Sequence, residues 1–377
     1  MAAIFSSSCK KDGGNTAGAI ELCEVGTGET RLKNHNNGLD YIITCDITMY
    51  SGKLVVEPGV SIKVKAGYTI YIEDQASIEI NGSEAERVTF EPFENEGIPS
   101  WGGIAIRNNN AANKINYASF NYGGSEEINP YFQGNSTVSI SGRCSMTGVT
   151  VRNSGGSGIF IDAGSNLPVF SSVLVEGSEN YALQIDRILV KNIQPGSFSA
   201  NGNGFNKIEV RNSTTLTGTH VWHNHGLPYM VAENFEIAEG AIELREGVVI
   251  EMETDKRIAV YDNGSLKISG TLASPVILRG KEALAGWWQG VTIQNTNPLN
   301  VWNNLEIAHG GSSPITFSSN TSSLNLGGYL GASTKLTVAN MLIRDGEGCG
   351  ILESSSSIDF TSTNVTFSNV DNNECTE

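Results

Sequence analysis

Two aspartates in neighbouring apolar segments are the most suggestive chemical feature of this sequence. Asp162 ends the run GIFID, and Asp186 ends the run ALQID 24 residues later. Because successive side chains of a strand alternate between its faces, Ile161 and Ile185 are expected to point inward and the two carboxylates outward, in register on adjacent strands. Two carboxylates about 5 Å apart repel each other, so either a cation such as Ca²⁺ lies between them or one keeps its proton.

The same pair of aspartates has a plainer explanation. Either Arg187 or Arg152 can neutralise an ordinary solvated pair of carboxylates, and we favour this explanation. If the chain is an enzyme, Asp162, Asp186 and Arg187 are expected to form its catalytic cluster. The sequence has no other recognisable catalytic motif, because no glycine-rich segment leads into Lys-Ser or Lys-Thr and no set of Ser, His and Asp stands out.

Aromatic residues form a second group of candidates. Exposed rings surrounded by Asn and Gly can stack on the apolar C–H faces of sugars. The candidates for such ligand stacking are Trp101, Tyr122, Trp222, Trp288 and Trp302. In an elongated repeat protein, however, rings more often cover the end of the apolar core or fill a bend, and we expect that role for most of them.

The first cysteine stands in a segment that resembles a bacterial lipoprotein cleavage site. The chain starts MAAIFSSSCKKDGGN, in which a short apolar stretch and small residues precede Cys9. The resemblance implies that Cys9 is acylated. Lys10, Lys11 and Asp12 resemble the charged tether of surface lipoproteins from Bacteroidetes. The alternative is a disordered tail with an unmodified cysteine.

The other cysteines lack the CxxC spacing of metal and redox sites. In an exported protein, Cys23 with Cys45 and Cys349 with Cys375 could each clip one end of the molecule, which would leave Cys144 free. Sequence alone does not fix this connectivity.

The charge balance excludes one class of partner. The chain has 24 Lys and Arg residues against 40 Asp and Glu residues, a net charge of -16. A surface of this sign repels the phosphates of nucleic acids, so we expect no nucleic-acid partner. No apolar stretch approaches the roughly 18 residues of a transmembrane helix, so we expect contact with a membrane only through a lipid anchor.

A long internal repeat decides the expected fold. Adding 188 to residues 39–90 places them on residues 227–278 without a gap, and an offset of 187 places WGGIAI at Trp101 on WQGVTI at Trp288. Apolar pairs two residues apart recur inside each half, as at Ile62 and Val64, with Gly, Asn, Ser and Asp between them. This pattern predicts two diverged copies of one long unit, each built from coils of short strands.

These motifs resemble those of right-handed parallel β-helix proteins of the pectin-lyase-like class, in particular lipoproteins of that shape from Bacteroidetes. The resemblance covers residues 39–370 and implies an all-β, single-stranded β-solenoid. We expect a signal remnant and tether at 1–19, an N-terminal cap at 20–45, a first β-helix half at 46–226 and a second half at 227–377, continuous with the first.

The resemblance does not extend to the catalytic residues of β-helix enzymes. The β-helical polygalacturonases have a DD pair, GHG and RIK, and none of these occurs in this sequence. The nearest segments, NHG at 224–226 and AHGG at 308–311, fall inside the repeat, so we expect His225 and His309 to be loop or stacking residues rather than catalytic ones.

We therefore expect a non-catalytic lipoprotein of the outer membrane, exposed at the cell surface or in the periplasm, that acts as an adhesin-like binding module. Its expected ligand is a glycan or another envelope or host surface component, and no cofactor other than Ca²⁺ is expected. We expect a monomer. The alternative is a polysaccharide lyase or glycoside hydrolase of the β-helix type, for which a groove walled by long loops over Asp162 and Asp186 would be the deciding feature.

Overall fold

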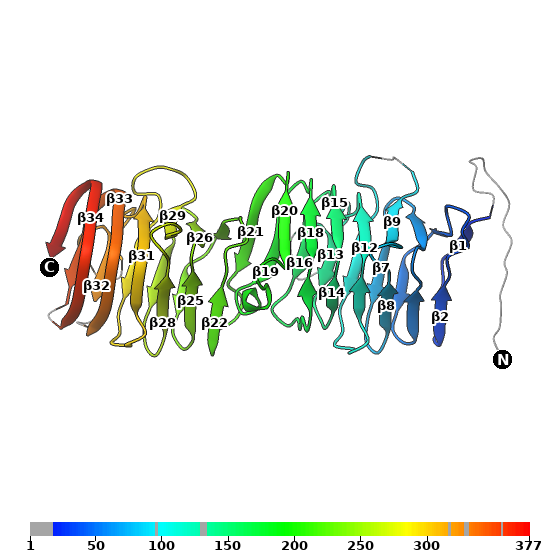
Figure 1. Ribbon diagram of the computed structural model, residues 1–377, viewed down its shortest axis with the longest axis horizontal. Helices are drawn as coiled ribbons and strands as arrows, with labels where there is room; N and C mark the ends of the chain where they lie inside the picture. Colours follow the sequence, from blue (N-terminus) through cyan, green and yellow to red (C-terminus); the bar gives the residue numbers. More distant parts are fainter. Residues whose placement is uncertain (1–17, 95–96, 129–133, 316–317, 328–331, 356) are drawn as a thin grey trace.

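The computed structural model describes residues 18–94, 97–128, 134–315, 318–327, 332–355 and 357–377. These residues form an elongated rod of short stacked strands, with β1 at one end and β34 at the other (Figure 1). The strands pair in parallel from one end to the other, as in a β-solenoid. The prediction of an all-β chain of stacked parallel strands is thus confirmed.

Two rows of parallel strands line the first half of the rod. The A row consists of β1 (Ile20–Leu22), β3 (Tyr41–Ile43), β6 (Ser61–Val64), β9 (Val88–Pro92), β12 (Ala118–Asn121), β15 (Thr150–Arg152), β18 (Val173–Glu176) and β20 (Phe198–Asn201). The B row consists of β2 (Glu29–Leu32), β5 (Lys53–Val56), β8 (Ser77–Asn81), β11 (Lys114–Asn116), β14 (Ser145–Thr147) and β17 (Phe170–Ser171).

A third row, here called the continuous row, runs through both halves. Its strands are β4 (Ile47–Met49), β7 (Thr69–Ile72), β10 (Gly103–Ile106), β13 (Ser136–Ile140), β16 (Ser157–Ile161), β19 (Tyr181–Asp186), β21 (Phe205–Arg211), β23 (Tyr229–Val231), β26 (Val249–Met252), β29 (Val276–Gly280), β31 (Val301–Ala308), β33 (Thr334–Ser354) and β34 (Ile358–Thr376).

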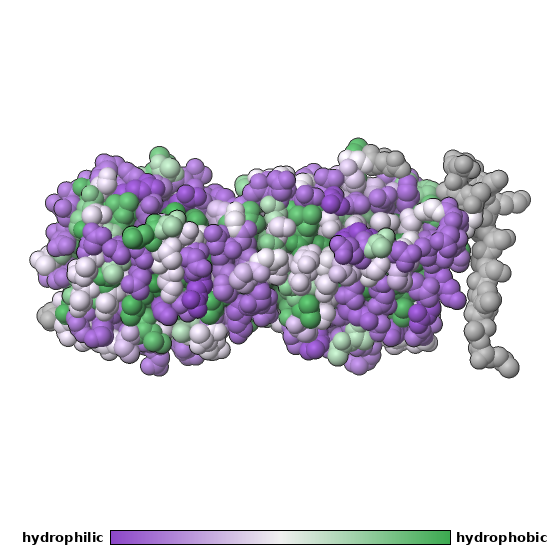
Figure 2. All heavy atoms as spheres, viewed as in Figure 1, coloured by the Kyte–Doolittle hydropathy of each residue, from purple (hydrophilic) through white to green (hydrophobic). Residues whose placement is uncertain are grey.

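Two new rows start in the middle of the rod. One consists of β22 (Thr219–Trp222), β25 (Ala241–Arg245) and β28 (Ser265–Ser269), and the other of β24 (Phe235–Ile237), β27 (Arg257–Val260), β30 (Gly290–Ile293) and β32 (Ser322–Gly327). A short 3₁₀ helix, η1 (Val190–Asn192), follows β19 in the chain and contacts β22, the first strand of one of these new rows. The rod narrows between its two halves in Figure 2.

The strands follow the repeat that the sequence displays. β3 starts at residue 41 and β23 at residue 229, which is 188 residues later, and the same difference separates the starts of every pair up to β9 and β29. The matched strands nevertheless lie in different rows. β3 belongs to the A row, whereas β23 stacks on β21 in the continuous row.

Inward side chains form one apolar column along the continuous row. The column passes in register through both halves and consists of Ile70, Ile104, Val138, Ile159, Leu183, Ile208, Tyr229 and Ile250, all of them buried. No single coil can bury its own apolar face, so neighbouring coils share the stabilisation.

Glycine permits the closest contacts between coils. A Cβ atom on Gly103 would lie 2.4 Å from the carbonyl oxygen of Thr137, and one on Gly290 would lie 2.5 Å from that of Ser323. Both glycines also have a positive φ, which other residues adopt only with strain. This is the physical reason why WGGI and WQGV both have glycine at their third position.

Candidate functional site

The structure places Asp186 inside the molecule rather than on its surface. Its side chain is 1% exposed, and its Oδ2 accepts hydrogen bonds from the backbone N–H and the hydroxyl of Ser213. Oδ1 accepts from the N–H of Ile188, 3.1 Å away, and so closes the turn that leads into η1. The expectation that this carboxylate faces outward beside Asp162 is therefore wrong, because the chain turns directly after β19 and covers it.

Arg187 is a structural residue as well. Its Nε donates to the carbonyl oxygen of Thr214 and its Nη1 to that of Glu236, both at 2.7 Å, and the side chain is 6% exposed. Asp162 is partly buried, and its Oδ1 accepts a hydrogen bond from the N–H of Ala163. The three residues therefore do not converge on a cleft as a catalytic cluster would.

The structure gives no support for Ca²⁺ between Asp162 and Asp186. Across the described ranges, no group of three or more His, Cys, Asp or Glu side chains is placed to hold a metal ion. Both oxygens of Asp186 are already used by protein donors. Arg152, the alternative partner that the sequence suggested, forms an ion pair with Glu176 at 2.9 Å instead.

Four of the five aromatic candidates lie in the core. Trp101, Trp222, Trp288 and Trp302 are fully buried, so they cannot stack on an external ligand. Three indole N–H groups donate to backbone carbonyl oxygens: Trp101 to Asn121 at 2.9 Å, Trp288 to Ala308 at 2.8 Å and Trp302 to Leu266 at 2.9 Å. Their predicted role in ligand stacking is wrong, because the rings are fully buried in the apolar core and these N–H groups are satisfied by backbone carbonyls.

Tyr122, the fifth aromatic candidate, occupies a turn, as does His309. Tyr122 is partly buried and has a φ of 57°, so it forms a tight corner between strands, and His309 forms another with a φ of 66°. Trp222 packs on Tyr229 and Phe235, with ring centroids 5.1 and 5.5 Å apart, and fills the place where the rows restart.

The cysteines form two disulfides, one near each end of the described rod. Cys23 is bonded to Cys45, and Cys349 to Cys375, the two pairs suggested by the sequence. Cys144 is buried with a free thiol, and this burial raises its pKa to about 12. Cys9 lies outside the described residues, as does the rest of 1–17 in the expected signal remnant and tether at 1–19. Among the helices within the described ranges, none has the length and apolarity to cross a bilayer.

A surface pocket over the row of β24, β27 and β30 brings polar and aromatic groups together. Ala259, on β27, is one of its lining residues, and we call it the Ala259 pocket. Its cavity of about 340 Å³ is lined by Glu236, Arg257, Ala259, Tyr261, Asp262, Gln294 and Ala332. This volume is at the lower end of the range for small-molecule sites, roughly 300–1,000 Å³.

One carboxylate organises the polar groups of this pocket. Oε2 of Glu236 accepts a hydrogen bond of 3.0 Å from the Tyr261 hydroxyl, and Oε1 lies 3.4 Å from Nη2 of Arg257. Burial and this hydrogen bond raise the pKa of Tyr261, so its hydroxyl remains a donor at neutral pH. Arg187, behind β24, holds the backbone of Glu236 in place.

The repeat shows why the pocket exists in the second half. Tyr71 stands 188 residues before Ala259, and Arg107 lies over its ring, 4.7 Å from the ring centre. Arg107 also pairs with Glu73 at 2.8 Å, so the matched position in the first half is filled by side chains. The pairing of Tyr71 with Ala259 was the sequence signal that could have revealed the pocket.

A pair of aromatic rings on the continuous row was also missed. Tyr181 and Phe205 lie with ring centroids 4.9 Å apart, and Phe205 is 43% exposed. Glu209, on the same strand as Phe205, is largely buried, and this burial raises its pKa. The pair could not be recognised from the sequence, because a bulge between Tyr181 and Leu183 shifts the strand register there.

No protein-family model and no curated protein matches this sequence.

Proposed function

We propose that this chain is a cell-envelope lipoprotein that binds a glycan without cleaving it, and that the Ala259 pocket is its binding site. The proposal includes a right-handed β-helix of the pectin-lyase-like class, built from two diverged copies of one unit. The observation that supports binding is the combination in one open pocket of a tyrosine ring, two carboxylates, a guanidinium and an amide. Sugar hydroxyls need such acceptors and donors, and a sugar ring needs an apolar wall.

The envelope location is supported by features outside the pocket. Cys9 follows small residues and precedes Lys10 and Lys11, and the two disulfides suit an oxidising compartment. The face in Figure 2 is mostly hydrophilic, with apolar residues scattered over it. Labelling of cells with radioactive palmitate should mark the wild-type protein and not the Cys9→Ser variant; equal labelling would refute the anchor.

Glycan binding is tested with the full chain carrying Cys9→Ser. The protein is applied to an array of envelope and host polysaccharides with Ca²⁺ present, and bound sugars are then analysed for shortened or unsaturated products. We expect binding without products, a loss of about tenfold or more in affinity for Tyr261→Ala, and unchanged binding for Phe205→Ala.

Other outcomes would redirect the assignment. Binding that Phe205→Ala abolishes and Tyr261→Ala leaves intact would move the site to the aromatic pair on the continuous row. Cleaved products would favour the lyase or hydrolase alternative.

A further inference from the structure

We infer that the Ala259 pocket takes a single uncharged pyranose ring, a conclusion that rests on the proposed glycan binding and specifies its ligand. The space in the pocket corresponds to one six-membered ring. β7 and β27 are matched strands, and the phenol ring of Tyr71 occupies the position that Ala259 leaves empty in the second half. A phenol and a pyranose are both six-membered rings, so the space released by this replacement suits one sugar unit.

The charges around the pocket favour an uncharged ligand. The pocket is bordered by the carboxylates of Glu236 and Asp262 and by one guanidinium, that of Arg257, which already pairs with Glu236. A uronic acid would bring a further negative charge to this site, and like charges in a partly buried site repel. Neutral sugar hydroxyls, in contrast, can donate to both carboxylates.

Arg257 supplies a candidate hydrogen-bond donor for the ligand. The Nε of Arg257 is buried and has no hydrogen-bond partner within the described part of the chain, although a buried donor normally has one. The side chain as a whole is 26% exposed, so a small shift would bring this N–H to a ligand oxygen. The ring of Tyr261 supplies the wall against which a sugar face can pack.

The matched half provides the test variant. Ala259→Tyr places in the pocket the side chain that the first half carries at the corresponding position. The control is Tyr71→Ala, which vacates that position in the first half. Thr48, Thr69 and Glu73 stand there where the pocket has Glu236, Arg257 and Tyr261, so no second site is expected.

The experiment titrates the full chain, with Cys9→Ser, by calorimetry with methyl glycosides of glucose, galactose, mannose and galacturonic acid, the last with its carboxylate free. We expect one neutral glycoside to bind at one site per chain, at least about tenfold more tightly than the uronate. Ala259→Tyr should abolish this binding, whereas Tyr71→Ala should leave one site. If Ala259→Tyr does not fold, Tyr261→Ala should weaken binding by about tenfold.

Each failure has a distinct meaning. Tighter binding of the uronate, two sites in Tyr71→Ala, or unchanged binding in the pocket variants would overturn the single-ring inference while glycan binding stands. If polysaccharides bind but none of the methyl glycosides does, the ligand is longer than one ring, and the inference is again wrong. Absence of binding to every sugar and polysaccharide would refute the proposed function itself.

Discussion

His225, a partly buried residue where the two halves meet, has a strongly lowered pKa. His225 lies beside the ring of Tyr229, with centroids 6.3 Å apart, and neither of its ring nitrogens has a partner among the described residues. Burial lowers the pKa of His225 to about 4, and the nearby His223 adds to this effect. The imidazole is therefore neutral in the folded protein at physiological pH.

This residue makes stability fall as the solution is acidified. The unfolded chain binds a proton at His225 near pH 6.5, whereas the folded chain does so only near pH 4. The stability present above pH 6.5 is thus lost progressively as the pH falls towards 4, on the order of 2 kcal/mol once partial exposure is allowed for. Thermal unfolding at pH 7 and pH 5 should show a smaller loss for His225→Gln than for the wild type. An identical loss in both proteins would contradict this assignment.

At the scale of elements, buried asparagines join the coils in both halves. In the first half, Nδ2 of Asn113 donates to Asn108 and its Oδ1 accepts from the N–H of Ile78. In the second half, Asn300 donates to Asn295 and accepts from the N–H of Leu266. The two networks involve the matched strands β8 and β28. In each of them, an asparagine side chain accepts the hydrogen bond of a buried backbone N–H.

Replacement of Asn300 should therefore lower the stability of the folded protein. Asn300→Ala leaves the buried N–H of Leu266 without an acceptor, which costs about 1–3 kcal/mol. We expect a lower melting temperature for this variant. Leu299→Ala is the control, because Leu299 is in the same turn and 53% exposed. Equal melting temperatures for the two variants would show that the network does not stabilise the turn.

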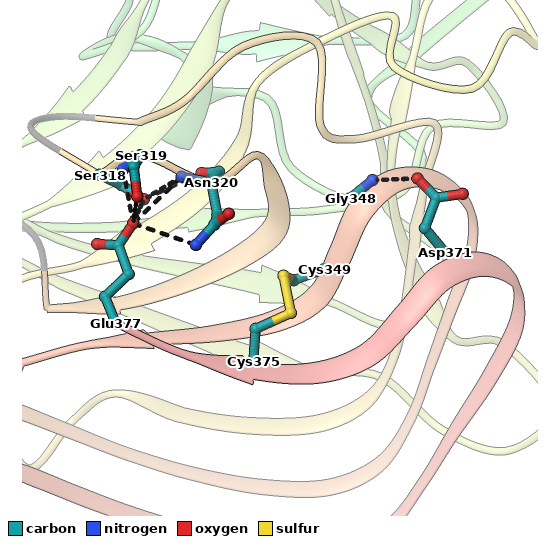
Figure 3. Close-up of a disulfide and its surroundings, with 8 residues drawn as sticks. All are labelled: Ser318, Ser319, Asn320, Gly348, Cys349, Asp371, Cys375 and Glu377. Carbon is teal, nitrogen blue, oxygen red and sulfur yellow. Dashed lines mark hydrogen bonds between the residues drawn. A yellow bond between two sulfur atoms is a disulfide. The ribbon is translucent and has the colours of Figure 1, made fainter.

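At the scale of the whole molecule, stability is shared between neighbouring coils, so the ends are the weakest places. The last strand, β34, pairs with β33 on one side only within the described chain. The Cys349–Cys375 bond ties these strands together (Figure 3). Near it, Asp371 accepts from the N–H of Gly348, and Glu377 accepts from Ser318, Ser319 and Asn320.

Loss of this disulfide should loosen one end of the rod without unfolding the rest. The bond closes a loop with a sequence separation of 26 residues, for which chain entropy predicts about 3.5 kcal/mol. In the variant Cys349→Ser with Cys375→Ser, hydrogen exchange should speed up in residues 358–377. Exchange in β7 and β10 should stay as in the wild type. Faster exchange along the entire chain would instead indicate a single cooperative unit.

The sequence by itself determined the local pattern of this protein. Apolar residues at every second position and turn residues between them predict short strands, and the starts of β3 and β23, like those of β9 and β29, lie 188 residues apart. Such information depends only on neighbouring residues or on a fixed offset, so it can be read from the sequence alone. The two cysteine pairs could be suggested for the same reason, because each lies within neighbouring coils.

Only the tertiary structure decided which side chains meet solvent and which rows the matched strands join. Alternation along β19 places Asp186 on the outer face, but the turn after it buries the carboxylate against Ser213. The burial of Trp101, Trp222, Trp288 and Trp302 was likewise visible only in the folded chain. The Ala259 pocket likewise depends on a small residue, Ala259, where the matched strand has Tyr71. The shape of the pocket is set by lining residues that come together only in the folded chain.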